Sequence, residues 1–245
     1  MKLALTNYEH ELFVGNTRIS GVSNTELSYS IPELPINILG FGHIGENFYN
    51  SDYPHPYSLS AINGPIEGNV SVGGYLIGED FFLQYTGVSP TSGSLRYGDD
   101  PPKHLGFSRA YLTQHSVKCS INQLPQYTTN FLILGNLGSG LNYEGRESFP
   151  PVKVVNQGGI ELNFKGSGTN RVVNFSYDVD VNRNAIYEIG SGKAYQVDVV
   201  WPIAVRASIT LEADDYQLRE LNEAFVKPNV EFFEITLKDC DNNYI

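Results

Sequence analysis

The chain of 245 residues has little of several things that mark common functional classes. It contains two cysteines, Cys119 and Cys240, too few for a disulfide framework and too far apart for a CxxC metal site. It carries 16 Lys and Arg against 27 Asp and Glu, which gives a net charge of −11. Proteins that hold nucleic acid tightly neutralise its phosphates with Lys and Arg, so this charge balance argues against such a protein.

Long apolar runs are also lacking. No window approaches the roughly 18 apolar residues that a membrane-spanning helix needs. The first residues do not form a signal peptide, because Asn7, Glu9, His10 and Glu11 interrupt the apolar stretch. We therefore expect a protein that is made in a cytoplasm and has no membrane partner.

Two short motifs resemble nucleotide-handling sites but are incomplete. Tyr97-Gly98-Asp99-Asp100 matches a metal-binding turn of viral polymerases, where paired carboxylates hold magnesium. Here the tetrapeptide lies in a Pro/Gly-rich segment of a small acidic chain, so an exposed turn explains it better. The run Gly190-Ser191-Gly192-Lys193 lacks the first glycine of a phosphate-binding loop and is not followed by a helix pattern, so it indicates a hairpin turn.

Metal and nucleophile patterns are equally weak. Asp178, Asp180 and Asn182 have the first spacings of a calcium loop, but the glycine that the loop needs next is missing. His115 and Cys119 fall on one face of a predicted strand, about 13 Å apart by strand rise. That separation is too large for a nucleophile and its base. We predict no catalytic site, no metal site and no cofactor.

What the chain does contain is strand signal, and residues 175–211 carry the longest continuous part of it. Apolar and polar side chains alternate there, as in a strand with one buried face. The apolar set is Phe175, Tyr177, Val179 and Val181, and the polar set is Ser176, Asp178, Asp180 and Asn182. We predict that the polar set faces solvent.

Similar runs along the chain predict a mainly β protein: a β-sandwich or barrel with one flanking α-helix and long loops. The Pro/Gly-rich segment 87–105 has little to bury, so we predict a loop or linker at 91–106. It would separate a β-rich first half, 1–90, from a β-rich second half, 107–245, unless both form a single domain. The convincing helix is 214–225, which has an acidic start, helical spacing of apolar residues and a proline after it.

Short internal echoes favour a duplicated sandwich. Residues 30–35, SIPELP, match residues 120–125, SINQLP, and residues 65–71 share the spacing of proline, isoleucine and serine with residues 202–208. Each echo by itself is short, but together they favour internal pseudosymmetry.

Two irregular segments, 42–57 and 135–151, are long enough to be arms or binding loops. The first holds four aromatic residues, Phe48, Tyr49, Tyr53 and Tyr57. Aromatic rings in a loop stack on sugars in some proteins, but more often they fix the loop or form a subunit contact. We predict loop contacts for these residues and keep carbohydrate or receptor binding as an alternative.

The stretches 19–40, 107–137 and 176–208 resemble tail tube and major tail proteins of tailed bacteriophages in phrases such as GVSNTELSYSIPELPINILG and YDVDVNRNAIYEIGSGKAYQVDVVWPI. The resemblance implies a structural virion protein that self-assembles into stacked rings around a channel. Genomic DNA would pass through that channel without specific binding. It implies no catalytic residues, and its partners would be further copies of itself and other virion proteins.

Within that resemblance, we expect Asp178, Asp180 and Asn182 to lie at a sheet edge that faces the channel or a neighbouring subunit. The resemblance implies a ring of six chains. If each chain holds two duplicated domains, a ring of three chains would imitate the six-fold ring. The alternatives are another virion part, such as a terminator, baseplate or decoration protein, and the carbohydrate- or receptor-binding sandwich. The sequence does not choose between a contractile and a non-contractile tail.

Overall fold

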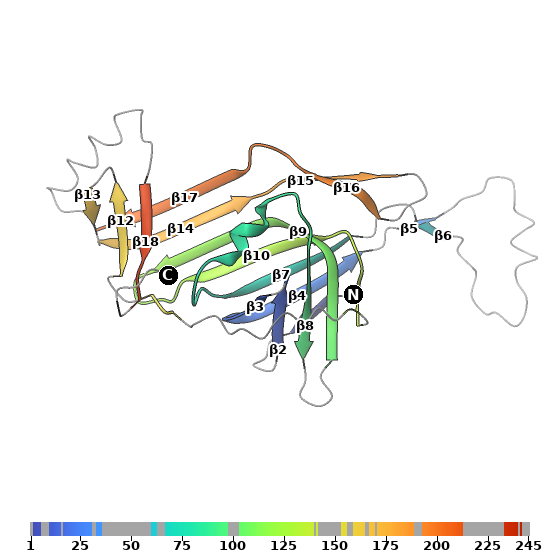
Figure 1. Ribbon diagram of the computed structural model, residues 1–245, viewed down its shortest axis with the longest axis horizontal. Coiled ribbons are helices and arrows are strands. Elements are labelled where there is room, and N and C mark those ends of the chain that lie inside the picture. Colours follow the sequence, from blue (N-terminus) through green and yellow to red (C-terminus); the bar gives the residue numbers. More distant parts are fainter. Residues whose placement is uncertain are drawn as a thin grey trace, which may run out of the picture.

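The computed structural model describes the strands of a mainly β protein and one short 3-10 helix, η1 (Figure 1). The described residues are 2–5, 10–15, 17–30, 33–35, 60–62, 67–97, 103–139, 141, 153–155, 159–164, 167–169, 171–188, 193–212, 233–239 and 241. The predicted fold class, a mainly β protein of sandwich or barrel type, is confirmed. No helix in these residues is long and apolar enough to cross a membrane.

Eleven strands form one large antiparallel sheet. They are β1 (Lys2–Leu5), β2 (His10–Val14), β3 (Thr17–Ile19), β4 (Val22–Ser30), β7 (Glu67–Tyr75), β8 (Thr91–Tyr97), β9 (Lys103–Ser120), β10 (Gln126–Ile133), β11 (Leu137–Gly138), β14 (Val172–Asp180) and β17 (Ala204–Leu211). The large sheet therefore includes strands from both the 1–90 and the 107–245 parts of the chain.

Smaller pairings surround this sheet. They are β5 (Glu33–Pro35) with β6 (Ser60–Ile62), β15 (Arg183–Tyr187) with β16 (Ala194–Val199), and β12 (Ile160–Phe164) between β13 (Ser167–Thr169) and β18 (Phe233–Leu237). The helix η1 spans Phe81–Thr86. The predicted helix 214–225 lies outside the described residues.

Strand β9 belongs to two layers and folds the sheet into a sandwich. Its first half pairs with β8, and its second half pairs with β14 along the same edge. Between the two halves Arg109 has a positive φ of 51°, an uncommon conformation for a residue other than glycine. The chain bends there, so β8, β2 and β3 pack over the layer formed by β4, β7, β10, β9 and β14. One apolar core joins residues from both layers, including Leu12, Leu95 and Phe131.

The prediction of a loop or linker at 91–106 is wrong over most of its length. Residues 91–97 form β8 and residues 103–106 begin β9. Gly93, which suggested a loop, lies in a buried strand where a β-carbon would meet the ring of Phe107 and the carbonyl of Phe13. Glycine marks a close approach of neighbouring chains here rather than a turn.

The strand signal at 175–211 is confirmed by β14, β15, β16 and β17. Strand β14 pairs directly with β17, and the β15–β16 hairpin is inserted between them in sequence. The predicted burial is correct, since Phe175, Val179 and Val181 are buried in the core. The chain reverses at Gly15, with φ of +61°, between β2 and β3.

Candidate functional site: a polar sheet face and its open edge

One face of the long layer is polar across six neighbouring strands. Residues that pair across antiparallel strands share a face, so the register identifies this surface. It comprises Glu26 and Ser28 of β4, Asn69 and Ser71 of β7, Thr128 and Asn130 of β10, Gln114, Ser116 and Lys118 of β9, Ser176, Asp178 and Asp180 of β14, and Arg206, Ser208 and Thr210 of β17. We call this set the polar face. Each of its side chains is exposed or half-buried.

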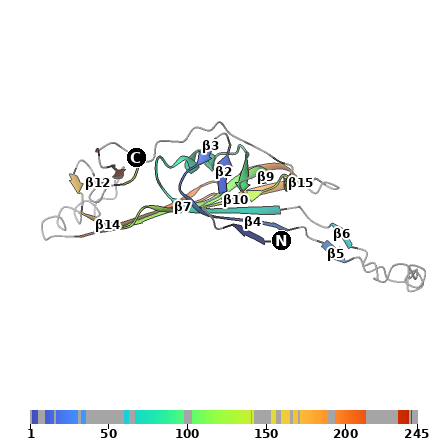
Figure 2. The same cartoon turned by 90° about the horizontal axis from the view of Figure 1, so that it is seen from below.

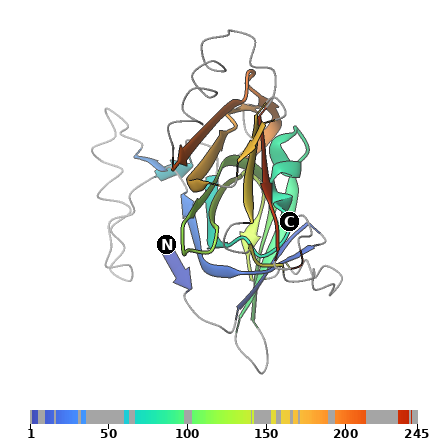
Figure 3. The same cartoon turned by 90° about the vertical axis from the view of Figure 1, so that its left-hand side faces the viewer.

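Most of the described elements that cover the sheet lie on the other side. In Figure 2, η1, β2, β3 and β12 all lie above the long layer of β4, β7, β10 and β14. The end-on view of Figure 3 shows η1 beside the same layer. On the side of the polar face, the β15–β16 hairpin covers one end of the sheet, where Tyr187 donates to Glu67 and packs with Leu132. The side chains of the polar face itself are exposed or half-buried.

Asp178 and Asp180 lie on the polar face, as the sequence predicted. Arg206 pairs with Asp178 in register and forms an ion pair with Asp180, with a nitrogen–oxygen distance of 3.1 Å. Asn182 follows the strand and is exposed, and its carbonyl accepts a hydrogen bond from the backbone of Val200. Among the described residues no group of three acidic, His or Cys side chains is placed to hold a metal ion.

The prediction that residues 178–182 form a sheet edge is wrong. Strand β14 has a partner on both sides, β9 and β17. The open edge is β17, which pairs with β14 alone among the described strands. The error arose because alternation shows which face a side chain takes but not how many neighbours a strand has.

The core is unfinished at this open edge. Val179 of β14 and Val205 of β17 pair in register and so share the inward face. Val179 is 5% exposed, whereas Val205 is 65% exposed. The segment before β17 adds Val200 and Trp201, which are also exposed. An edge strand with free backbone groups and exposed apolar side chains is a surface suited to pairing with another chain.

Four polar side chains on the covered side of the layer form a linked group. His115 is fully buried on β9, with Nε2 2.7 Å from Asp80 Oδ2 and Nδ1 2.7 Å from Thr129 Oγ1. The hydroxyl of Tyr177 also donates to Asp80 Oδ2, and the backbone N–H of Phe82 donates to Asp80 Oδ1. We call Asp80, His115, Thr129 and Tyr177 the buried polar cluster. Because His115 and Thr129 are fully buried, the cluster fixes η1 to the sheet and does not resemble an accessible catalytic triad.

A second link holds the other end of η1. The guanidinium of Arg183 donates to the carbonyls of Gly87 at 2.6 Å, Tyr85 at 3.1 Å and Leu112 at 2.9 Å. Burial lowers the pKa of Arg183, and the charge of Tyr111 partly opposes this effect. Carbonyls at the end of a helix lack backbone partners, so the arginine supplies the donors that they need.

Sequence reasoning missed η1 and the buried polar cluster. One signal pointed to His115: it lies in phase with Val117 and Cys119, both buried on the inner face of β9. The aromatic residues Phe48, Tyr49, Tyr53 and Tyr57 lie outside the described residues, as do the arm segment 42–57 and most of 135–151. No known family model matches the chain, and no curated protein matches it.

Proposed function

We propose that this protein is a structural subunit without catalytic activity that assembles with further copies of itself, and that the polar face lines a channel. The observation that supports this proposal best is the extent of that face over six strands. It consists mostly of Ser, Thr, Asn and Gln side chains, whose polar groups form hydrogen bonds with water. No cofactor or membrane is part of the proposal.

The charge of the face suits a channel for DNA. Only two of its side chains are basic, Lys118 and Arg206, and Arg206 is already paired with Asp180. The whole chain carries a net charge of −11. Few phosphate contacts mean weak binding, so a duplex would move past such a wall without being held.

The open edge supplies the means of assembly. In the series β1, β4, β7, β10, β9, β14 and β17 every neighbouring pair is antiparallel, so β1 and β17 run in the same direction. Both end strands have one described partner. A ring needs β17 to contact a different surface of the next copy, whereas pairing of β17 with β17 gives a closed dimer.

The narrower form of the proposal comes from the sequence resemblance: a bacteriophage tail tube subunit that is made in the host cytoplasm and incorporated in the virion as stacked rings. The same face and edge would serve another ring-forming part of a virion. The number of subunits in the ring is set by the contact angle at the edge.

Negative-stain microscopy and light scattering of the purified chain test the proposal. We expect rings or tubes of uniform diameter, and we expect Val205→Asp to prevent them because it places a charge on the apolar edge. Val88→Asp is the matched control, since Val88 is 59% exposed and is not part of β17. A monomer at high concentration, or a dimer that does not grow, would contradict the proposal. Assembly by the Val205→Asp variant would contradict the role of the edge.

A further inference from the structure

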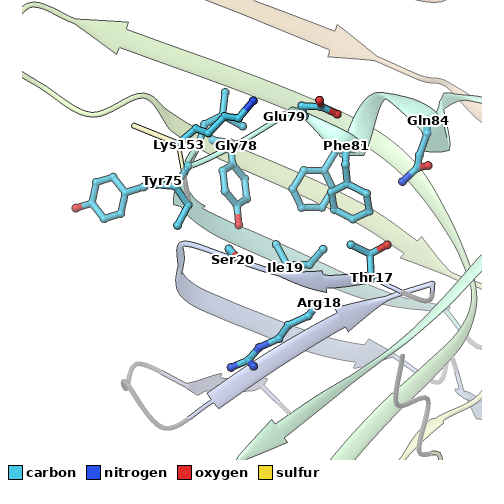
Figure 4. A pocket seen from close by; sticks show the side chains of 14 residues that line it. Thr17, Arg18, Ile19, Ser20, Tyr75, Gly78, Glu79, Phe81, Gln84 and Lys153 are labelled. Atoms are coloured by element: carbon cyan, nitrogen blue, oxygen red, sulfur yellow. The ribbon is translucent and has the colours of Figure 1, made fainter. Parts of the chain in front are cut away.

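A cavity of about 420 Å³ lies on the covered side of the sheet, away from the polar face. It is bounded by β3, the end of β7, the loop after β7 and η1. Figure 4 shows Phe81 and Gln84 of η1 across the cavity from Thr17 and Ser20. A volume of this size lies in the range of small-molecule sites, and most such sites join apolar walls to a few polar groups.

The hydroxyl of Tyr127 supplies an unsatisfied polar group in this cavity. Tyr127 lines the cavity and is 3% exposed, and its hydroxyl has no hydrogen-bond partner in the part of the chain that the structure describes. Burial and, to a smaller extent, the charge of Asp80 raise the pKa of Tyr127. The hydroxyl therefore stays protonated at neutral pH and offers a donor.

The rest of the lining determines which kind of ligand could reach the Tyr127 hydroxyl. Apolar walls come from Ile19, Leu76, Phe81 and Phe82. The Phe81 and Phe82 rings lie 4.8 Å apart with a 45° tilt, so they form an angled apolar wall. A flat apolar group has favourable contacts there.

The charges near the donor disfavour an anion. The carboxyl of Asp80 accepts from Phe82, His115 and Tyr177, and its charge acts on Tyr127. An anionic ligand at the Tyr127 hydroxyl would be repelled by this carboxylate. The lining has two basic residues, Arg18 and Lys153. Arg18 forms an ion pair with Glu11, and Lys153 also interacts with another residue.

We propose that this cavity binds a small neutral molecule that has an aromatic body and a carbonyl oxygen. The aromatic body packs against Phe81 and Phe82, and the oxygen accepts a hydrogen bond from the Tyr127 hydroxyl. This binding site is independent of assembly at the open edge, since neither β17 nor the polar face contributes to its lining.

Ligand titrations followed by protein NMR test the proposal with three related probes: benzamide, benzoate and toluene. We expect benzamide to bind about fivefold more tightly than toluene, because one neutral hydrogen bond contributes about that factor to the affinity. We also expect benzamide to bind more tightly than benzoate. Tyr127→Phe removes only the hydroxyl, so we expect it to abolish the preference for benzamide and to keep toluene binding. Tyr75→Phe, at another tyrosine of the lining, should keep the preference.

Thermal unfolding of the Tyr127→Phe variant without ligand gives a second readout. Because the buried hydroxyl has no partner, its removal should leave the unfolding midpoint unchanged or raise it. A lower midpoint would show that the hydroxyl is already satisfied and would overturn the proposal. Absence of binding by both benzamide and toluene would overturn it too, as would a benzamide preference that survives Tyr127→Phe.

Discussion

The two faces of the long layer use polar residues in opposite ways. On the covered face, His115 and Thr129 are fully buried, and each polar atom of the His115 ring has a specific partner. On the polar face, many Ser, Thr, Asn and Gln side chains are exposed to solvent, and the Asp180–Arg206 pair is among the few ionic contacts. The comparison shows that buried polar groups fix the fold, whereas exposed ones are available for a function.

Two aspartates give the largest contrast between the faces. Asp80→Ala leaves Phe82 N–H, His115 and Tyr177 without their acceptor, so we expect a loss of about 3 kcal/mol in the free energy of unfolding. Asp180→Ala removes only an exposed ion pair with Arg206, so we expect a change within about 0.5 kcal/mol. Urea unfolding monitored by circular dichroism measures both. Equal losses in the two variants would contradict the contrast.

Adjacent threonines on β10 give a finer test. Thr129 is buried and its hydroxyl contacts His115, whereas its neighbour Thr128 is exposed on the polar face. Thr129→Val keeps the shape and removes the hydroxyl, so we expect a loss of about 1–2 kcal/mol. Thr128→Val should stay within about 0.5 kcal/mol. The same urea titration applies, and a Thr129→Val protein as stable as the wild type would show that the contact with His115 contributes nothing.

Lysine substitutions on the polar face should change stability least, and they test whether this face lines a channel for DNA. Gln114→Lys combined with Thr128→Lys adds two positive charges to the face that carries Lys118, which we expect to change the free energy of unfolding by less than about 0.5 kcal/mol. The variant should retain duplex DNA in low-salt gel-shift assays and release it as salt rises. Ser89→Lys with Gln123→Lys adds the same charge at exposed positions elsewhere.

Retention of DNA by the control variant to the same degree would show that net charge alone is responsible. No retention by the Gln114→Lys and Thr128→Lys variant would show that the polar face is not accessible to a duplex. Either result would remove the argument that this face lines a channel.

Much of the fold followed from alternation, and the errors have a common cause. The inward positions Phe175 and Val179 and the outward positions Asp178 and Asp180 were assigned correctly. Residues 91–97 and 103–106 were assigned wrongly because Pro and Gly content was taken as evidence of a loop, although Gly93 is required by close packing against Phe107. The internal duplication and the helix at 214–225 stay predictions.

The sequence by itself determined which side chains of a strand share a face, because that property depends only on the two-residue period of an extended chain. It showed that Asp178 and Asp180 belong to a polar surface. Only the tertiary structure decided that β17 rather than β14 is the open edge, and that His115 meets an aspartate 35 residues earlier in the chain. Both depend on pairing between distant segments, which local alternation does not encode.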